Sequence, residues 1–240
     1  MTFLRCIQFC ALLENAEKLI LILCAKSIII IHKKLMHMMD ILIATKNRHK
    51  VEEIRDIFRH EKIRLIDLSH FPAIPEATED GKTFAENARI KAQYYHIKTT
   101  LPVIADDSGL VVPVLDGEPG IYSARYAGPD ADYQDNNSKL LEKLKTIPVG
   151  QRQAYFVCFA VFWDGRILLE EEGRIFGTIA FDLRGSKGFG YDPLFQIKGS
   201  VTTLAEISAD EKNRISHRYQ AFTKLKNALE MYMTEINIDR

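Results

Sequence analysis

The sequence of 240 residues has few cysteines, a single tryptophan and no excess of charge of either sign. Its cysteines, Cys6, Cys10, Cys24 and Cys158, have no histidines at zinc-ligand spacing beside them, so we expect a reduced, cytoplasmic protein without a zinc site. Its 32 basic residues balance 32 acidic ones, which leaves no overall positive field to attract nucleic acid or an acidic membrane. An anionic ligand must therefore be held by a local cluster of cations.

The sequence also lacks the uninterrupted run of about 20 apolar residues that a membrane-spanning helix requires. Its most apolar stretches, residues 19–25 and 27–31, are interrupted and flanked by lysines. Acidic residues precede them and no small-residue cleavage pattern follows, which disfavours a signal peptide. The methionines just before the first predicted strand are Met36, Met38 and Met39. We interpret residues 1–39 as an extension of no catalytic use and residues 40–240 as one functional domain.

What the sequence does contain is an alternation of strand and helix patterns that is typical of an α/β protein. We predict strands over residues 41–45, 63–68, 101–105, 153–163, 167–181 and 194–197. We predict helices around residues 51–58, after a capping box at Thr83 and Glu86, and over residues 215–233. Asp164 and Gly165 separate two of the strands and predict a tight antiparallel hairpin.

Two adjacent carboxylates, Asp106 and Asp107, follow an apolar strand-like segment and precede Ser108 and Gly109. Successive side chains of a strand point to opposite faces, so the two aspartates should have different roles. One could face a cleft, where it holds a divalent metal or takes a proton from water, while the other accepts hydrogen bonds from the scaffold. A simple turn at the end of the strand would explain the same residue types.

A basic turn joins the first predicted strand to the first predicted helix and consists of Thr45, Lys46, Asn47, Arg48, His49 and Lys50. Backbone N–H groups and cations that converge at a helix N-terminus form an anion site. The turn lacks the glycines and the Lys-Ser/Thr ending of a Walker loop. A solvated basic turn remains the alternative.

An acidic loop and the helix after it supply further candidates. Glu79 is used by no local motif, whereas Glu86 is explained by its capping box. Glu79 is therefore the better ligand to join Asp107 at a hard cation such as Mg²⁺. Lys91 could reach a phosphate, although a solvated helix lysine is the simpler interpretation.

Two clusters nearer the C-terminus could recognise a base or a phosphate. The first comprises Phe189, Gly190, Tyr191 and Asp192, preceded by Gly188. Its glycines allow close backbone approach and its phenylalanine offers a stacking surface, although a buried packing corner would look the same. The second comprises Lys212, Ser216, His217 and Arg218. Their donors could bind a keto oxygen or a phosphate, or could simply lie at the surface.

Together these segments resemble the inosine triphosphate pyrophosphatase family, whose members hydrolyse non-standard purine nucleoside triphosphates. The resemblance covers about residues 40–232 and rests on residues 45–50, 83–88, 105–110, 119–126, 188–193 and 216–218. It implies an α/β fold with a mixed twisted sheet, flanking helices and a nucleotide-binding cleft between two lobes. It also implies a homodimer that uses Mg²⁺.

The resemblance further implies cleavage of dITP, ITP, XTP or dXTP between the α- and β-phosphates, which yields a monophosphate and pyrophosphate and removes these nucleotides from the pool. By the same resemblance Asp107 is the proton acceptor and, together with Glu79, a Mg²⁺ ligand. The phosphates are held by the basic turn, Lys91, Ser108 and Lys212. The base is enclosed by Phe189, Gly190, Tyr191, Asp192, His217 and Arg218.

Base selection follows if His217 and Arg218 donate hydrogen bonds to O6 of the purine. An adenine amino group would then face donors, and unpaired polar groups can discriminate by ~10⁴, so ATP should be rejected. GTP also carries a keto oxygen at C6, so its rejection must involve C2. Two alternatives stay open, a related pyrophosphatase for other modified nucleotides, including pyrimidines, and a non-catalytic module that senses triphosphates.

Overall fold

A computed structural model describes residues 38–60 and 62–238, with the backbone alone for residues 235–238. The extension predicted over residues 1–39 therefore lies almost entirely outside the described residues. Among the described residues, Asp40–Arg59 and residues 65–238 belong to one compact unit, which holds every site residue. In the part of the chain that is described, no helix combines the length and the apolar character needed to cross a membrane.

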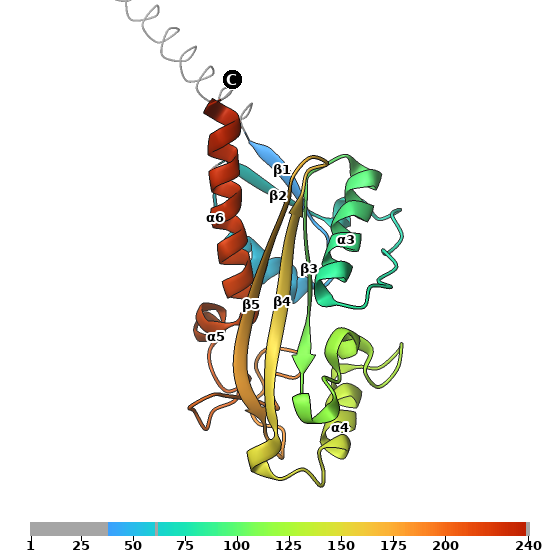
Figure 1. Ribbon diagram of the computed structural model, residues 1–240, viewed down its shortest axis with the longest axis vertical. Coiled ribbons are helices and arrows are strands. Elements are labelled where there is room, and N and C mark those ends of the chain that lie inside the picture. Colours follow the sequence, from blue (N-terminus) through green and yellow to red (C-terminus); the bar gives the residue numbers. More distant parts are fainter. Residues whose placement is uncertain (1–37, 61, 239–240) are drawn as a thin grey trace, which may run out of the picture. The chain divides into compact units, whose positions relative to one another are not determined.

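The strands form one mixed sheet of six (Figure 1). In sheet order they are β2 (Ile63–Asp67), β1 (Met39–Ile43), β3 (Val103–Val111), β4 (Gln153–Trp163), β5 (Leu168–Ile179) and β6 (Phe195–Ile197). β1 runs parallel to β3, whereas β3, β4, β5 and β6 pair antiparallel in that order. The predicted mixed sheet is thus confirmed, and the division into two lobes stays a prediction.

In the described part of the chain, five helices flank this sheet, and α3 and α6 make most of the contacts with its strands. They are α2 (Arg48–Ile57), α3 (Phe84–Thr99), α4 (Tyr133–Lys143), α5 (Ala209–Ile215) and α6 (His217–Ile238). The apolar side of α3 (Ala88, Ala92 and Tyr95) packs against Val103 and Ala105 of β3. In Figure 1, α6 packs against β4 and β5 on the side of these strands away from α3. The predicted α/β class is confirmed.

The main difference from the sequence prediction concerns β3. The sequence predicts that the strand ends at Ala105, but β3 continues through both aspartates to Val111. Asp106 pairs with Ala160 of β4, and Asp107 pairs with the neighbouring Phe159. The turn interpretation is therefore wrong, because β4 supplies a ladder partner for each residue of this polar segment. Regular strand geometry then sends the two carboxylates to opposite faces of the sheet.

Two further differences concern helices. The helix predicted over residues 215–233 is confirmed as α6, which begins at His217 and extends to Ile238. The short helix before it, α5, is not predicted from the sequence, and Ser216, whose backbone is extended (φ −66°, ψ 153°), separates the two. Helix α4 is not among the helices predicted from the sequence. The hairpin predicted at Asp164 and Gly165 is confirmed by the antiparallel pairing of β4 with β5.

Replacing Gly173 of β5 by alanine is expected to destabilise the contact between β5 and α6. A Cβ atom there would lie 2.1 Å from the carbonyl oxygen of His217 and 2.6 Å from the backbone nitrogen of Ala221. Because backbone atoms cannot rotate away, the helix must shift, and we expect the free energy of unfolding in urea to fall by about 1–3 kcal/mol. Gly150→Ala is the matched control, since no atom would contact the new Cβ and the change should stay below about 0.5 kcal/mol. Equal stability of the two variants would contradict this close packing.

Candidate active site

A cavity of about 270 Å³ lies beside the polar segment of β3 and is termed the main cavity. The predicted residues that line it are Thr45, Asn47, Lys50, Glu79, Lys91, Asp107, Ser108, Phe189, Gly190, Tyr191, Asp192, Lys212, His217 and Arg218. Lys46, Arg48 and His49 do not line it. The fold thus gathers most of the predicted residues, from segments far apart in the sequence, around one space.

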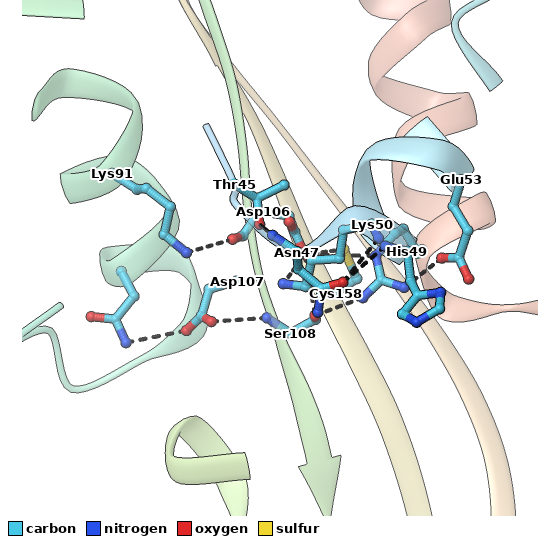
Figure 2. Close-up of polar contacts among 12 residues, drawn as sticks. Thr45, Asn47, His49, Lys50, Glu53, Lys91, Asp106, Asp107, Ser108 and Cys158 are labelled. Carbon is cyan, nitrogen blue, oxygen red and sulfur yellow. Dashed lines mark hydrogen bonds and ion pairs between the residues drawn. The ribbon is translucent and has the colours of Figure 1, made fainter. Parts of the chain in front are cut away.

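Asp106 lies on the buried side of the site. Its Oδ2 atom accepts hydrogen bonds from Lys50 Nζ at 2.8 Å and Ser108 Oγ at 3.1 Å, and it lies 3.8 Å from Arg218 Nε (Figure 2). Burial alone would raise the pKa of this carboxyl, but Lys50, Arg218 and Lys91 together hold the pKa far below its ordinary value. Asp106 is therefore ionised and held by the scaffold.

Asp107 points to the other face of β3 and lines the main cavity. Its Oδ2 atom accepts a hydrogen bond from Asn87 Nδ2 at 3.1 Å, and its Oδ1 atom accepts one from the backbone N–H of Ser108 at 3.0 Å. Burial raises the pKa of Asp107 above its ordinary value, against the opposing effects of Lys91 and Lys50. A carboxylate with a raised pKa is a stronger proton acceptor, which suits Asp107 to general-base chemistry.

Lys91 of α3 connects this aspartate pair to the acidic loop. Its Nζ atom donates to the carbonyl oxygen of Asp106 at 2.9 Å and lies 3.0 Å from Glu79 Oε1. Burial lowers the pKa of Lys91, but the carboxylates of Glu79, Asp106 and Asp107 raise it by more than burial lowers it. The pKa of Lys91 therefore lies above its ordinary value. The side chain is therefore a buried cation beside the main cavity.

The basic turn of residues 45–50 does not act as a single group. Asn47 is the N-cap of α2, because its Oδ1 atom accepts hydrogen bonds from the backbone N–H groups of His49 at 3.0 Å and Lys50 at 3.3 Å. These two donors are used within the turn and are not free for a phosphate. The side chain of Lys50 is held by Asp106 as described above.

Lys46 and Arg48 line hollows next to the main cavity, and Lys46 shares one of them with Glu79 and Lys91. Lys46 Nζ lies 3.2 Å from Glu76 Oε1, and both side chains are exposed. Arg48 lines a neighbouring hollow that also contains Arg55 and Asp67. The role of Lys46 and Arg48 in holding phosphates stays a prediction.

At the other end of the main cavity, Phe189 lies between two glycines in left-handed conformations, with φ of +73° at Gly188 and +63° at Gly190. Asp192 Oδ2 accepts hydrogen bonds from the backbone N–H of Phe189 at 2.8 Å and from Lys212 Nζ at 2.6 Å. Lys212 Nζ also lies 4.4 Å from the centre of the Phe189 ring. An aromatic ring with a cation beside it is a surface on which a base can stack.

His217 and Arg218 begin α6 and are almost fully buried. The ring of His217 stacks on Phe156, with 4.9 Å between ring centres and 10° between planes. Burial, assisted by the charges of Arg218 and Lys212, holds the pKa of His217 well below its usual range, so the imidazole is neutral. Its Nδ1 atom has no hydrogen-bond partner among the described residues. A neutral imidazole can donate one hydrogen bond and accept another, which suits it to reading a base.

Glu53 of α2 belongs to the site but is missed by the sequence analysis. Its carboxylate accepts a hydrogen bond from Arg218 Nη1 at 2.5 Å and lies 3.6 Å from Lys212 Nζ. Arg218 Nη2 donates in addition to Ser108 Oγ at 3.0 Å. No local pattern marks Glu53, because its partners Lys212 and Arg218 lie far along the chain on α5 and α6.

Two other contacts fix the loop of residues 188–192, termed the base loop, and are also missed. The hydroxyl of Tyr191, which is buried, donates to the carbonyl oxygen of Ser123 at 2.9 Å. Asn137 Nδ2 of α4 donates to the carbonyl oxygen of Gly190 at 2.9 Å. Ser123 lies in the segment of residues 119–126 that carries the family resemblance, but the sequence gives neither Ser123 nor Asn137 a role, because each acts through contact with a distant segment.

The carboxylates of Asp107 and Glu79 line the same cavity and are the pair that could hold a divalent cation. Glu86 is used at the start of α3, where its carboxylate accepts a hydrogen bond from the backbone N–H of Lys82 at 2.6 Å. Within residues 38–60 and 62–238, no group of three His, Cys, Asp or Glu side chains forms a complete metal site. Two carboxylates still fit Mg²⁺, which commonly binds one or two and completes its shell with substrate phosphates and waters.

Known proteins are similar to this chain in both sequence and fold. The sequence model of the Ham1 family matches residues 41–228. The dITP/XTP pyrophosphatase of Thermoanaerobacter pseudethanolicus is 45% identical over 191 residues, which are 79% of this chain and 96% of that protein. The dITP/XTP pyrophosphatase of Geobacillus kaustophilus is 46% identical over 194 residues, which are 80% of this chain and 95% of that protein.

Solved structures give the same result. A HAM1 protein from Coxiella burnetii superposes with a TM-score of 0.75 at 38% identity, over 81% of this chain and 100% of that one. The Ham1 protein of Staphylococcus aureus superposes with a TM-score of 0.74 at 38% identity, over 80% of this chain and 99% of that one. Sequence and structure therefore match over the part of the chain that carries the main cavity.

Proposed function

The chain belongs to the Ham1 family, and from this premise we propose that it hydrolyses non-standard purine nucleoside triphosphates. The substrates are dITP, ITP, XTP and dXTP, and the products are the nucleoside monophosphate and pyrophosphate. The observation that carries the proposal is the main cavity, in which the buried carboxylate of Asp107 lies between lysines and an aromatic base loop. Relatives 45% and 46% identical bear the name dITP/XTP pyrophosphatase, which supports the same substrate class.

In this reaction Asp107 takes a proton from the attacking water. The water oxygen forms a bond to the α-phosphorus, the bond from that phosphorus to the oxygen that bridges to the β-phosphorus breaks, and pyrophosphate leaves with the electron pair. Lys50 and Lys91 approach β3 from α2 and α3 (Figure 2) and supply positive charge beside the phosphates. Preorganised charge of this kind stabilises the transition state without a cost of reorganisation.

Asp107 and Glu79 would hold Mg²⁺, which when bound neutralises phosphate charge during the reaction. Lys91 pairs with Glu79 in this structure, so a Glu79 that turns to a cation would leave Lys91 free for a phosphate. We assign phosphate binding to residues that line the main cavity near Asp107 and carry hydrogen-bond donors or cations. They are Thr45, Asn47, Lys50, Lys91 and Ser108.

The base would stack on Phe189 and meet His217 and Arg218 at its edge. Donors directed at O6 favour hypoxanthine and xanthine, whereas the adenine amino group in the same place would leave polar groups unpaired and cost up to ~10⁴ in specificity. We therefore expect ATP to be rejected. Rejection of GTP must depend on contacts at C2.

Multiple-turnover release of pyrophosphate tests this proposal over a panel of dITP, XTP, GTP, ATP and dTTP with Mg²⁺. We expect kcat/KM for dITP and XTP to exceed that for ATP by about 10⁴, and we expect excess EDTA to stop the reaction. Efficient turnover of dTTP would favour a pyrophosphatase for other modified nucleotides instead. Binding without turnover would favour a sensor, and full activity in EDTA would exclude a metal-assisted reaction.

The proposal includes residues 40–240 as the catalytic domain, a homodimer and a cytoplasmic location. The family match that begins at residue 41 supports the domain boundary. Light scattering tests the dimer, and cell fractionation tests the location.

A further inference from the structure

We propose that His49 is a positioning residue, which holds the ring of Phe189 in place as the stacking surface for the substrate base. This inference rests on the proposed function. The two rings are stacked, with 5.0 Å between centres and 10° between planes. Sequence position groups His49 with the phosphate-binding turn, but its side chain reaches the base loop instead. In Figure 2 it lies on the side of Glu53, away from Lys91 and Asp107.

Phe189 separates two spaces. One is the main cavity, which Phe189 lines and His49 does not. The other, which we term the side hollow, is lined by His49 and Phe189 together with Glu52 and Leu204. Lys212 borders both spaces beside the ring. His49 therefore supports Phe189 from the side hollow and leaves the ring accessible from the main cavity, where the base would enter.

The hydrogen bonds that hold the base loop act on its backbone and on Tyr191, so they do not set the orientation of the Phe189 ring, which needs support of its own. Gly188 and Gly190 flank it with left-handed φ, and glycine is the residue with the greatest backbone freedom. The hydrogen bond from the backbone N–H of Phe189 to Asp192 fixes the peptide but not the side chain. His49 lies in the capped first turn of a regular helix, so its ring has a firm attachment.

The stack also connects the two ends of the substrate site. The helix that carries His49 carries Lys50, which reaches Asp106 beneath the phosphate end. Phe189 is thereby tied to the element that positions the phosphates. Loss of the His49 ring should weaken binding of the base and leave the affinity for phosphates and the chemical step unchanged.

Kinetics of His49→Ala, His49→Phe and Glu52→Ala test this role. Each variant is assayed for kcat and KM with dITP, and for the inhibition constant of inorganic tripolyphosphate, which carries phosphates without a base. His49→Ala should raise the KM for dITP about fivefold to tenfold, where tenfold is about 1.4 kcal/mol and within the range of one base–aromatic stack. Its kcat and its inhibition constant for tripolyphosphate should stay within about twofold, since a positioning residue for the base loses ground-state binding only.

The other two variants separate stacking from mere occupancy. His49→Phe keeps a flat aromatic ring, so its KM should return to within about twofold of the wild type. Glu52→Ala removes an exposed neighbour that lines the same side hollow and should change neither constant.

Several results would overturn the inference. Parallel weakening of dITP and tripolyphosphate binding in His49→Ala would place His49 at the phosphates. An unchanged KM in His49→Ala, or no recovery in His49→Phe, would show that Phe189 does not depend on this stack. Absence of dITP turnover by the wild-type protein would instead reject the proposed function, so the two failures are distinguishable.

Discussion

Replacing Asp107 by asparagine should lower kcat for dITP by at least about 100-fold, because loss of a general base typically costs that much or more. Asparagine has nearly the same shape as aspartate but cannot take a proton from water. Asp107 also supplies one of the two carboxylates that would hold the metal, so both functions are lost together. Pyrophosphate release under saturating dITP and Mg²⁺ gives the measurement.

The same substitution should leave the protein folded. Burial raises the pKa of Asp107, which means that folding disfavours its ionised form, and removal of the charge therefore costs no ion-pair energy. We expect the free energy of unfolding to change by less than about 1 kcal/mol. A variant that keeps more than about a tenth of the wild-type kcat would exclude Asp107 as the essential base. A variant that fails to fold would show that its contacts with Asn87 and Ser108 are structural.

The division of labour between the two aspartates could be predicted from the sequence because it depends on the chain itself. Side chains alternate along any strand, so Asp106 and Asp107 had to face different surroundings. The length of β3 could not be predicted in the same way. Asp, Ser and Gly favour turns locally, and only the pairing with Ala160 and its neighbours on β4 keeps this segment extended.

In the basic turn, the partner that each side chain contacts could not be predicted from the sequence. Its six residues share a charge pattern, but the helix that starts at Arg48 rotates successive side chains by about 100°. Lys50 thus reaches Asp106 while His49 reaches Phe189. Which partner each side chain meets depends on segments far along the chain, and no local pattern contains that information.

Residues that act through another residue are missed for the same reason. Glu53 contacts Arg218, and Asn87 contacts Asp107, yet each is an ordinary polar residue within its own helix. The break at Ser216 is a related case, because it allows α5 and α6 to direct Lys212 and His217 toward one cavity. α4 is different, since the capping box that opens it, formed by Asp132 and Asp135, is visible in the sequence.

Replacing Asp106 by asparagine should cause a large loss of stability, whereas Asp107→Asn should mainly cause a loss of activity. The pKa of Asp106 lies far below its ordinary value of 3.8 because Lys50, Arg218 and Lys91 outweigh the effect of burial. Folding therefore favours its ionised form at neutral pH, and the variant loses that contribution while Lys50 and Arg218 stay in place without their shared anion. Removal of one partner from a buried ion pair costs about 3–5 kcal/mol. For a domain of this size a loss of about 3 kcal/mol lowers Tm by roughly 6–12 °C.

Two measurements identify the ion pair as the cause of this loss. A double variant with Lys50→Met removes the unpaired cation as well, so its loss should be smaller than the sum of the two single losses. The second measurement is the pH dependence of unfolding. A carboxyl whose pKa is lowered by folding stabilises the fold at a pH above its ordinary pKa, and this stabilisation is lost as the pH falls through the pKa of the folded state. The difference in the free energy of unfolding between the wild type and Asp106→Asn should therefore decrease below pH 3.8. An Asp106→Asn protein that melts within about 2 °C of the wild type would show that Lys50 and Arg218 find other partners, and that Asp106 does not hold the buried side of the site together.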